Sequence, residues 1–77
     1  MITRKQAPVL EFISNFLAFN NYAPSVREIQ KGVGHSSTSS VWQLLRELQD
    51  RSVIRRIPGK HRSIEILKWP SRVGDDE

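Results

Sequence analysis

The sequence predicts a mainly α-helical domain that ends in a small β-hairpin, and three observations indicate this fold class. Apolar residues recur at helical spacing in three separate stretches of residues 1–50. After Leu48 the pattern changes to short β-branched segments on either side of the turn signal "PGKHR". A chain of 77 residues holds one small core. We therefore expect a single domain over residues 1–67, with residues 68–77 as a tail or the start of a linker.

The first helix is indicated by apolar positions that share one face, namely Val9, Phe12, Ile13, Phe16 and Leu17. Its start is marked by "TRKQ", in which Thr3 and Gln6 are spaced as a capping box. Pro8 removes a backbone donor, so either the helix begins later than the box implies or its first turn is distorted. We expect the helix to end at "NNY", because Asn tolerates the left-handed conformation.

The second helix begins in "APSVRE", where Ser25 is the expected N-cap and Glu28 completes a capping box. Pro24 disfavours helix before that point, and Gly34 stands where a C-terminal glycine is preferred. The side chains expected to point inward are Val26, Ile29 and Val33.

The third helix is expected after "GHSS", with Ser36 or Ser37 as its N-cap. Its core face is a stripe at helical spacing formed by Val41, Leu44, Leu45 and Leu48. At 100° per residue, a polar row falls nearly opposite this stripe, while Ser40 and Trp42 flank it. That outward row consists of Ser39, Gln43, Arg46 and Asp50.

Two strands are expected in "SVIRRI" and "SIEIL", and in the second Ile64 and Ile66 alternate with polar residues. A hairpin this short is marginal alone, so it must pack on the helices. Lys60, His61 and Arg62 make its tip basic. Three helices followed by such a hairpin is the order of a three-helix winged helix-turn-helix.

Composition points to a polyanionic partner and away from catalysis. The chain has no cysteine, no glycine-rich phosphate loop, no metal-ligand spacing and no apolar run long enough for a membrane span. Its formal charge is +4, but three of its 8 acidic residues are the last three. Residues 1–74 therefore carry 12 basic against 5 acidic side chains. A basic surface of this kind either attracts a nucleic acid or only confers solubility. We expect a cytoplasmic, non-enzymatic protein that needs no cofactor, metal or small-molecule ligand, and nucleic acid is the simplest partner for its charge.

The outward row of the third helix suits the major groove of duplex DNA. Gln can pair with adenine, Arg with guanine, and an aromatic edge can meet a thymine methyl group. The serines are either helix caps or phosphate donors, Arg27 is a phosphate contact or part of a solvated face, and Trp42 either meets a base or packs under the hairpin. The candidate DNA-binding residues are Ser25, Arg27, Ser37, Ser39, Ser40, Trp42, Gln43, Arg46, Lys60, His61 and Arg62.

From Thr3 to Leu67 the chain resembles the N-terminal DNA-binding domain of the LexA repressor family, in the form found in Gram-positive bacteria. The matching pieces are "TRKQ", "YAPSVREI", "VGHSSTSSV" and "VIRRIPGKHRSIEIL". By position, the segment from Ser37 to Arg46 matches the family's recognition helix, and Lys60 to Arg62 match its wing. Ser52 stands where the family usually has glycine, and Trp42 and Gln43 differ from the residues expected in the Gram-positive form.

The resemblance implies a repressor of DNA-damage-inducible (SOS) genes that binds inverted-repeat operators as a dimer. The family's second domain carries the self-cleavage site and makes the dimer, and "KWPSRVGDDE" after Leu67 cannot supply it. The chain is then either a piece of a longer repressor or a stand-alone phage or plasmid regulator. The competing hypothesis is a winged-helix module for protein–protein contact, anchored by Trp42 and Phe19.

Overall fold

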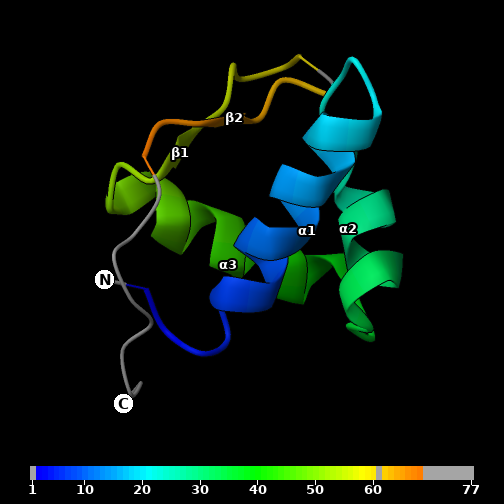
Figure 1. The fold of residues 1–77 in the computed structure, drawn as a ribbon. Coiled ribbons are helices and arrows are strands. Elements are labelled where there is room, and N and C mark those ends of the chain that lie inside the picture. Colours follow the sequence, from blue (N-terminus) through cyan, green and yellow to red (C-terminus); the bar gives the residue numbers. More distant parts are fainter. Residues whose placement is uncertain (1, 61, 69–77) are drawn as a thin grey trace.

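The fold is three helices followed by a two-stranded antiparallel hairpin, as predicted. A computed structural model describes residues 2–60 and 62–68. The elements are α1 (Ala7–Phe19), α2 (Val26–Val33), α3 (Thr38–Asp50), β1 (Ile54–Arg55) and β2 (Glu65–Ile66). Figure 1 shows the hairpin running above α3, with its loop reaching the segment that joins α1 to α2. Residues 69–77 of the expected tail (68–77) and the predicted site residue His61 lie outside the described residues.

The capping box of "TRKQ" forms, but one turn ahead of α1. The Thr3 amide donates to Gln6 Oε1 over 3.1 Å, and the Gln6 amide donates to Thr3 Oγ1 over 3.2 Å. The helix itself begins at Ala7, with Pro8 in the first turn, where its missing donor costs nothing. Of the two alternatives that the sequence left open, the later start is therefore the one adopted.

The expected left-handed end of α1 is wrong. Asn20 is extended, with φ −132° and ψ 152°. Its backbone N–H and its side-chain Nδ2 both donate to the carbonyl of Phe16, at 2.9 and 3.0 Å. The helix thus ends at "NNY" as expected, but with an extended residue and a second, side-chain hydrogen bond to a last-turn carbonyl that the backbone already satisfies.

The predicted boundaries of α2 are confirmed at both ends. The Glu28 amide donates to Ser25 Oγ over 3.1 Å, and the Ser25 amide donates to Glu28 Oε1 over 2.9 Å. Gly34 adopts φ 78°, a left-handed conformation that costs a residue with a Cβ more than it costs glycine. Ile29 is fully buried, whereas Val26 and Val33 are half-buried at the edge of the core.

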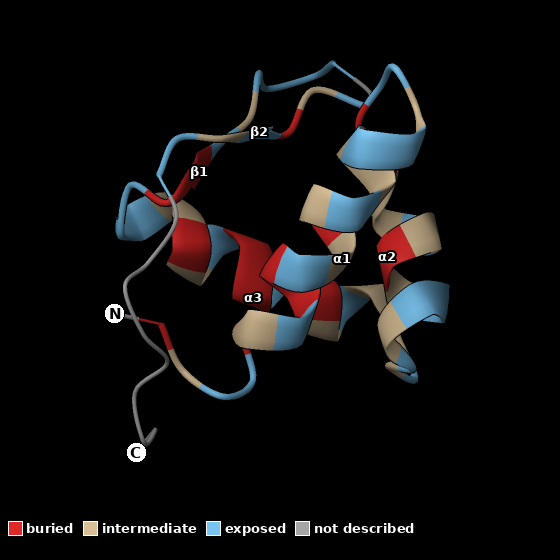
Figure 2. Cartoon of the chain, in the orientation of Figure 1, coloured by how far each residue is buried: buried red, intermediate tan, exposed pale blue. Residues whose placement is uncertain are grey.

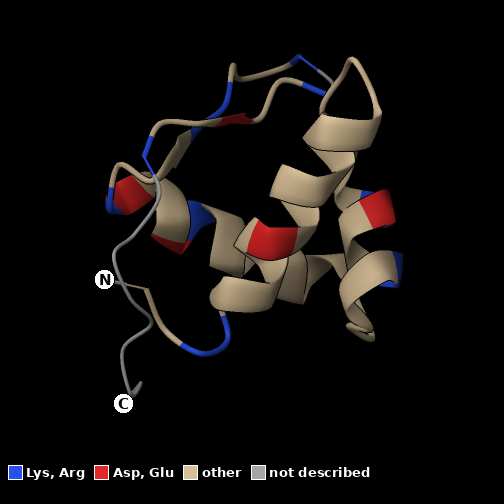
Figure 3. Ribbon diagram, in the orientation of Figure 1, with Lys and Arg blue, Asp and Glu red and all other residues tan. Residues whose placement is uncertain are grey.

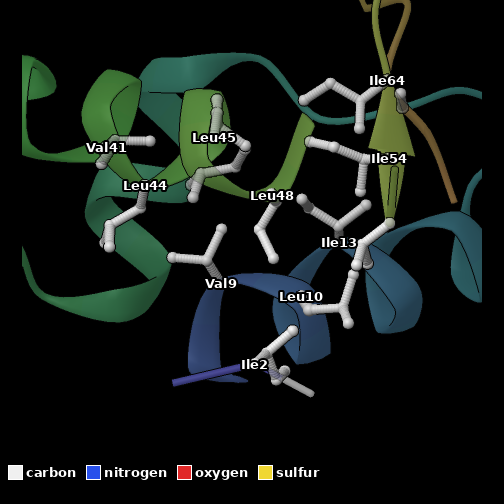
Figure 4. Packing of buried hydrophobic residues seen from close by; sticks show 13 residues of the cluster. Ile2, Val9, Leu10, Ile13, Val41, Leu44, Leu45, Leu48, Ile54 and Ile64 are labelled. Atoms are coloured by element: carbon white, nitrogen blue, oxygen red, sulfur yellow. The ribbon is translucent and has the colours of Figure 1, made fainter. Parts of the chain in front are cut away.

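The core lies between the three helices and the hairpin. Figure 2 shows the buried segments on the facing sides of these elements, and Figure 4 shows Ile54 and Ile64 of the hairpin packed beside Ile13 and Leu48. All four predicted core residues of α3 are buried. Isolated from this support, so short a hairpin would not be stable.

The buried face of α1 is turned from the one predicted. It comprises Val9, Leu10 and Ile13, while Phe12, Phe16 and Leu17 are only half-buried. The helical spacing alone does not show that Ile2, ahead of the helix, is also in the core and packs beside Leu10 (Figure 4). Because Ile2 covers Leu10, the buried face of α1 is wider on this side than the apolar stripe predicted.

Helices α1 and α2 approach closely at Gly32. A Cβ added there would overlap the aromatic ring of Phe12. The glycine therefore supplies the space that the Phe12 ring occupies, although a helix interior normally disfavours glycine.

The strands are shorter than the sequence predicted, with two residues each. Ile54 pairs with Ile66 and Arg55 with Glu65, and Arg55 Nε lies 2.6 Å from Glu65 Oε1. We call residues 54–66 the wing. Ser52, just before it, adopts φ 60°, which gives a physical reason for glycine at this position in the family that the chain resembles.

Candidate nucleic-acid interface

The exposed face of α3 carries the residues predicted to read bases. Ser39, Gln43 and Arg46 are exposed, and the opposite face of the helix is held in the core. Together with Asp50 they form a polar row along the outside of the helix, as the periodicity predicted. Their side chains line a shallow hollow of about 670 Å³ on the outer side of α3. This row is therefore accessible to a partner without any change in the core.

The start of α3 differs in detail from the expected cap. Ser37 is the N-cap residue, but its side chain makes no capping hydrogen bond to the helix. Its Oγ instead lies 3.5 Å from the Oγ of Ser40. The first-turn N–H groups of α3 thus lack the side-chain acceptor that an N-cap serine usually provides.

Trp42 lies where α3 meets the wing. The guanidinium of Arg56 is stacked 4.4 Å from the centre of the Trp42 ring, and Arg56 Nε donates to Gln49 Oε1 over 3.3 Å. Trp42 nevertheless keeps 42% of its surface exposed. The indole therefore packs against a wing residue and remains available at the outer surface, so the two alternatives drawn from the sequence are compatible.

A basic cleft of about 520 Å³ separates the start of α2 from α3 and the wing. Ser25 and Trp42 are among its lining residues, and so are four cationic side chains, whereas none of the described residues that line it is acidic. The four cations are Arg27, Arg56, Lys60 and Arg62. Figure 3 shows Lys and Arg positions along the ribbon at the tip of the wing, close to the turn before α2. The clustered cations make the electrostatic potential of this cleft positive, so an anionic partner would be attracted to it.

Arg62 has partners within the chain that the sequence did not indicate. Its NH1 and NH2 groups donate to Glu28 Oε1 and Oε2 over 2.9 and 3.2 Å. NH1 also donates to the carbonyl of Ala23 over 3.2 Å, and the guanidinium stacks 4.7 Å from the Tyr22 ring. The Ser25 amide and Arg62 together lower the pKa of Glu28, because both donate hydrogen bonds to its ionised form.

The other flank of α3 carries a second hollow, of about 760 Å³, beside the turn that precedes α1. Lys5, Ser40 and Gln43 line it. At its edge the buried Gln6 donates from Nε2 to Glu47 Oε1 over 2.7 Å. This bond ties the beginning of α1 to the middle of α3 and fixes how α3 is rotated.

Sequence reasoning missed three contributors to this surface. Arg56 and Lys5 were visible as charges, but only the fold brings them to the two flanks of α3. Glu28 was identified as a cap, and no local pattern could pair it with a residue 34 positions away.

Other classes of site find no support in the part of the chain that the structure describes. Within residues 2–60 and 62–68, no group of three His, Asp or Glu side chains is placed to hold a metal ion. None of the helices there is long and apolar enough to cross a membrane.

Comparison with known proteins gives one consistent result. The family model described as the LexA DNA binding domain matches residues 1–63. The chain is 53% identical over 66 residues to the LexA repressor of Clostridium novyi, covering 86% of this chain and 32% of that protein. It is 46% identical over 70 residues to the LexA repressor of Pelotomaculum thermopropionicum, covering 91% and 34%. With the LexA repressor of Clostridioides difficile it shares 43% identity over 74 residues, covering 96% and 35%. The chain thus spans about a third of the length of the curated relatives that it matches.

Proposed function

The chain belongs to the LexA DNA-binding domain family, and we propose that it is the DNA-reading part of a sequence-specific transcriptional repressor. In this proposal α3 enters the major groove of duplex DNA and the wing contacts the phosphate backbone. The observation that carries it is the exposed row of Ser39, Gln43 and Arg46 on a helix whose other face is locked in the core.

Each residue of the row has a chemical reason to be there. Arg46 offers a bidentate donor pair to guanine, and Gln43 can donate and accept with adenine. Ser39, one turn earlier on the same face, is short enough for the helix to approach the base edges closely. Trp42 is proposed to lie at the rim of the groove, where its exposed edge can meet a thymine methyl group.

The phosphate contacts are proposed to come from both ends of the basic cleft. Lys60 and Arg27 supply charge, and the first-turn N–H groups of α3 can bind a phosphate oxygen with help from the hydroxyls of Ser37 and Ser40. Ser25 accepts from its own helix through Oγ, which leaves its O–H free to donate. These contacts would set register and orientation, while the outward row of α3 sets sequence.

At the level of the whole regulator, we propose two copies on an inverted repeat and repression by promoter occlusion, within a DNA-damage (SOS) response. Relatives over most of this chain are named LexA repressors, which supports the repressor role. A stand-alone accessory regulator that competes for the same operators uses the same DNA-reading surface, so the experiment below tests the reading of DNA itself.

The test is selection of bound duplexes from a random pool at one stated salt concentration, followed by affinity measurements on the selected site. Gln43→Ala and Arg46→Ala should each cost about 1–3 kcal/mol on that site and relax the preference at one base pair. Asn15→Ala, an exposed polar position on α1, is the matched control and should change neither affinity nor preference. Equal losses on selected and random duplex would refute base reading by that residue.

Binding of a labelled random duplex at low salt separates this proposal from a protein–protein module. Basic DNA-binding domains bind non-specific DNA in the micromolar range or better. Absence of any mobility shift at micromolar protein would favour the protein–protein alternative.

A further inference from the structure

Arg62 makes four interactions with one short segment, residues 22–28. Its two terminal nitrogens meet the two carboxylate oxygens of Glu28 at 2.9 and 3.2 Å, which is the fork geometry of a strong charge-assisted pair. A further hydrogen bond to the Ala23 carbonyl and stacking on Tyr22 complete the set. A phosphate contact by this guanidinium would have to displace these partners.

Lys60 at the same loop is the opposite case. Its side chain is exposed on the cleft, and its ammonium makes no hydrogen bond or ion pair with any residue of the described ranges 2–60 and 62–68. Of the predicted tip residues Lys60 and Arg62, Lys60 is therefore the one available to an incoming phosphate.

The loop between the strands is ordered internally by Ser63. Ser63 Oγ accepts from the Ile57 amide over 3.1 Å and lies within hydrogen-bond distance of the carbonyls of Ile57 and Lys60, at 3.3 and 3.1 Å. These bonds fix the shape of the loop but do not attach it to the helices. Arg56 attaches the β1 end of the loop to α3 through Trp42 and Gln49. The contacts of Arg62 attach its tip to the start of α2.

The backbone at Arg62 supports an anchoring role. Its φ is 54°, in the left-handed region that non-glycine residues rarely adopt. Such a conformation persists where the surroundings hold it in place. Here the pairing with Glu28 and the bond to the Ala23 carbonyl are the restraints that the structure provides.

We propose that Arg62 is a positioning residue for DNA binding: paired with Glu28, it clips the wing to the start of α2 and thereby places Lys60 at the phosphate backbone. This inference rests on the proposed function and changes the role of Arg62 within it. The carboxylate of Glu28 serves both as the cap of α2 and as the anchor of the wing.

The direction in which Glu28→Gln changes duplex affinity distinguishes a positioning role of the Arg62–Glu28 pair from a purely electrostatic effect. Glu28→Gln removes a negative charge beside the proposed DNA surface, so Coulomb interactions alone would raise affinity for a duplex. Gln preserves the capping box, because its side-chain oxygen still accepts from the Ser25 amide. If the clip places the wing, the same substitution must lower affinity instead.

The experiment measures affinity for a random-sequence duplex as a function of salt, for wild type and for Glu28→Gln, Arg62→Ala and the double variant. Losing one phosphate contact costs up to about eightfold at 0.1 M salt, given a slope of about −0.9 per contact. We expect both single variants to lose affinity up to this factor, and the double variant to lose no more than either. Thermal unfolding confirms that each variant is folded at the assay temperature.

Two comparisons make the result specific to the clip. Glu65→Gln is the matched control, because it also removes a carboxylate that pairs with an arginine, but within the wing itself. It should leave affinity unchanged or slightly raised. In a Lys60→Ala background, Glu28→Gln should no longer lower affinity, and Arg62→Ala should lower it less than in the wild-type background, since the contact that they position is already gone.

The outcomes separate this inference from the proposed function. Unchanged or increased affinity in Glu28→Gln, with a shallower salt slope only in Arg62→Ala, would overturn positioning and make Arg62 a direct phosphate contact. Positioning would also be overturned if Arg62→Ala lowered duplex affinity as much in the Lys60→Ala background as it does in the wild type. If the wild type binds no duplex, the proposed function fails. Amide relaxation of Lys60 and Ser63 in Glu28→Gln then still decides whether the clip holds the wing: unchanged relaxation would overturn it.

Discussion

Gln6 offers a quantitative test of how α3 is held. Its side chain is 1% exposed, accepts from the Thr3 amide over 3.1 Å and donates to Glu47 Oε1 over 2.7 Å. Gln6→Ala removes both bonds and leaves a half-buried carboxylate without this donor. A hydrogen bond to a charged group contributes about 1.5–3 kcal/mol, and a lost cap costs about 1 kcal/mol. We expect Gln6→Ala to lower the free energy of unfolding by about 2–4 kcal/mol.

That loss is large for a domain of this size. A chain of 77 residues has a total stability of about 4–12 kcal/mol. At about 4–8 °C per kcal/mol, the midpoint of thermal unfolding should fall by about 8–32 °C. Far-UV circular dichroism during heating and urea titration measures both quantities.

A double-mutant cycle with Glu47→Ala isolates the bond between the two side chains. Because the residues are in contact, the two losses should overlap by about 0.5–3 kcal/mol rather than add. Glu47→Gln is the milder control, since its amide oxygen can still accept from Gln6. Additive losses, or a loss below about 0.5 kcal/mol in Gln6→Ala, would refute the tether between α1 and α3.

Two further predictions concern α2. Gly32→Ala should lower the free energy of unfolding by about 1–3 kcal/mol, because its Cβ overlaps the Phe12 ring. In a Phe12→Leu background, which has no ring at this place, Gly32→Ala should cost much less. An unchanged urea midpoint for Gly32→Ala would contradict the close approach of the two helices. The pKa of Glu28 is lowered by the Ser25 amide and by Arg62, so its contribution to stability is present above the ordinary value of 4.5 and is lost as pH falls through the lower folded value. The difference in unfolding midpoint between wild type and Glu28→Gln should therefore be constant near neutral pH and vanish in acid, and a difference that persists there would contradict the assignment.

Features set by local sequence could be predicted from it. The apolar stripe of α3, the capping box at Ser25 and the left-handed Gly34 each depend on residues within one or two turns, and each is confirmed. The three-helix order with a following hairpin is confirmed for the same reason, because periodicity changes once along the chain.

Features set by distant residues could not be predicted. The buried face of α1 is turned toward Leu10 because Ile2, which lies ahead of the helix, extends the core. Likewise, Glu47 accepts a hydrogen bond from Gln6 across 41 positions. No periodicity reports which side chains meet across such separations.

The candidate interface divides in the same way. The outward row of α3 followed from helical geometry alone, and it is exposed as predicted. Which wing cation can contact a phosphate depends on which of them is already paired within the chain. Only the fold shows that Arg62 is paired with Glu28. The assignment of residues to base and phosphate contacts stays a prediction until duplex binding is measured.

The double use of the Glu28 carboxylate also bears on how the domain folds. A wing with two residues in each strand has too few backbone bonds to form early, and its anchor is complete only once the first turn of α2 exists. Helix formation and docking of the wing are then linked through one side chain across 34 positions. The wing should therefore not open as an independent unit but belong to the same cooperative transition as the helices, protected from local unfolding although it lies at the surface.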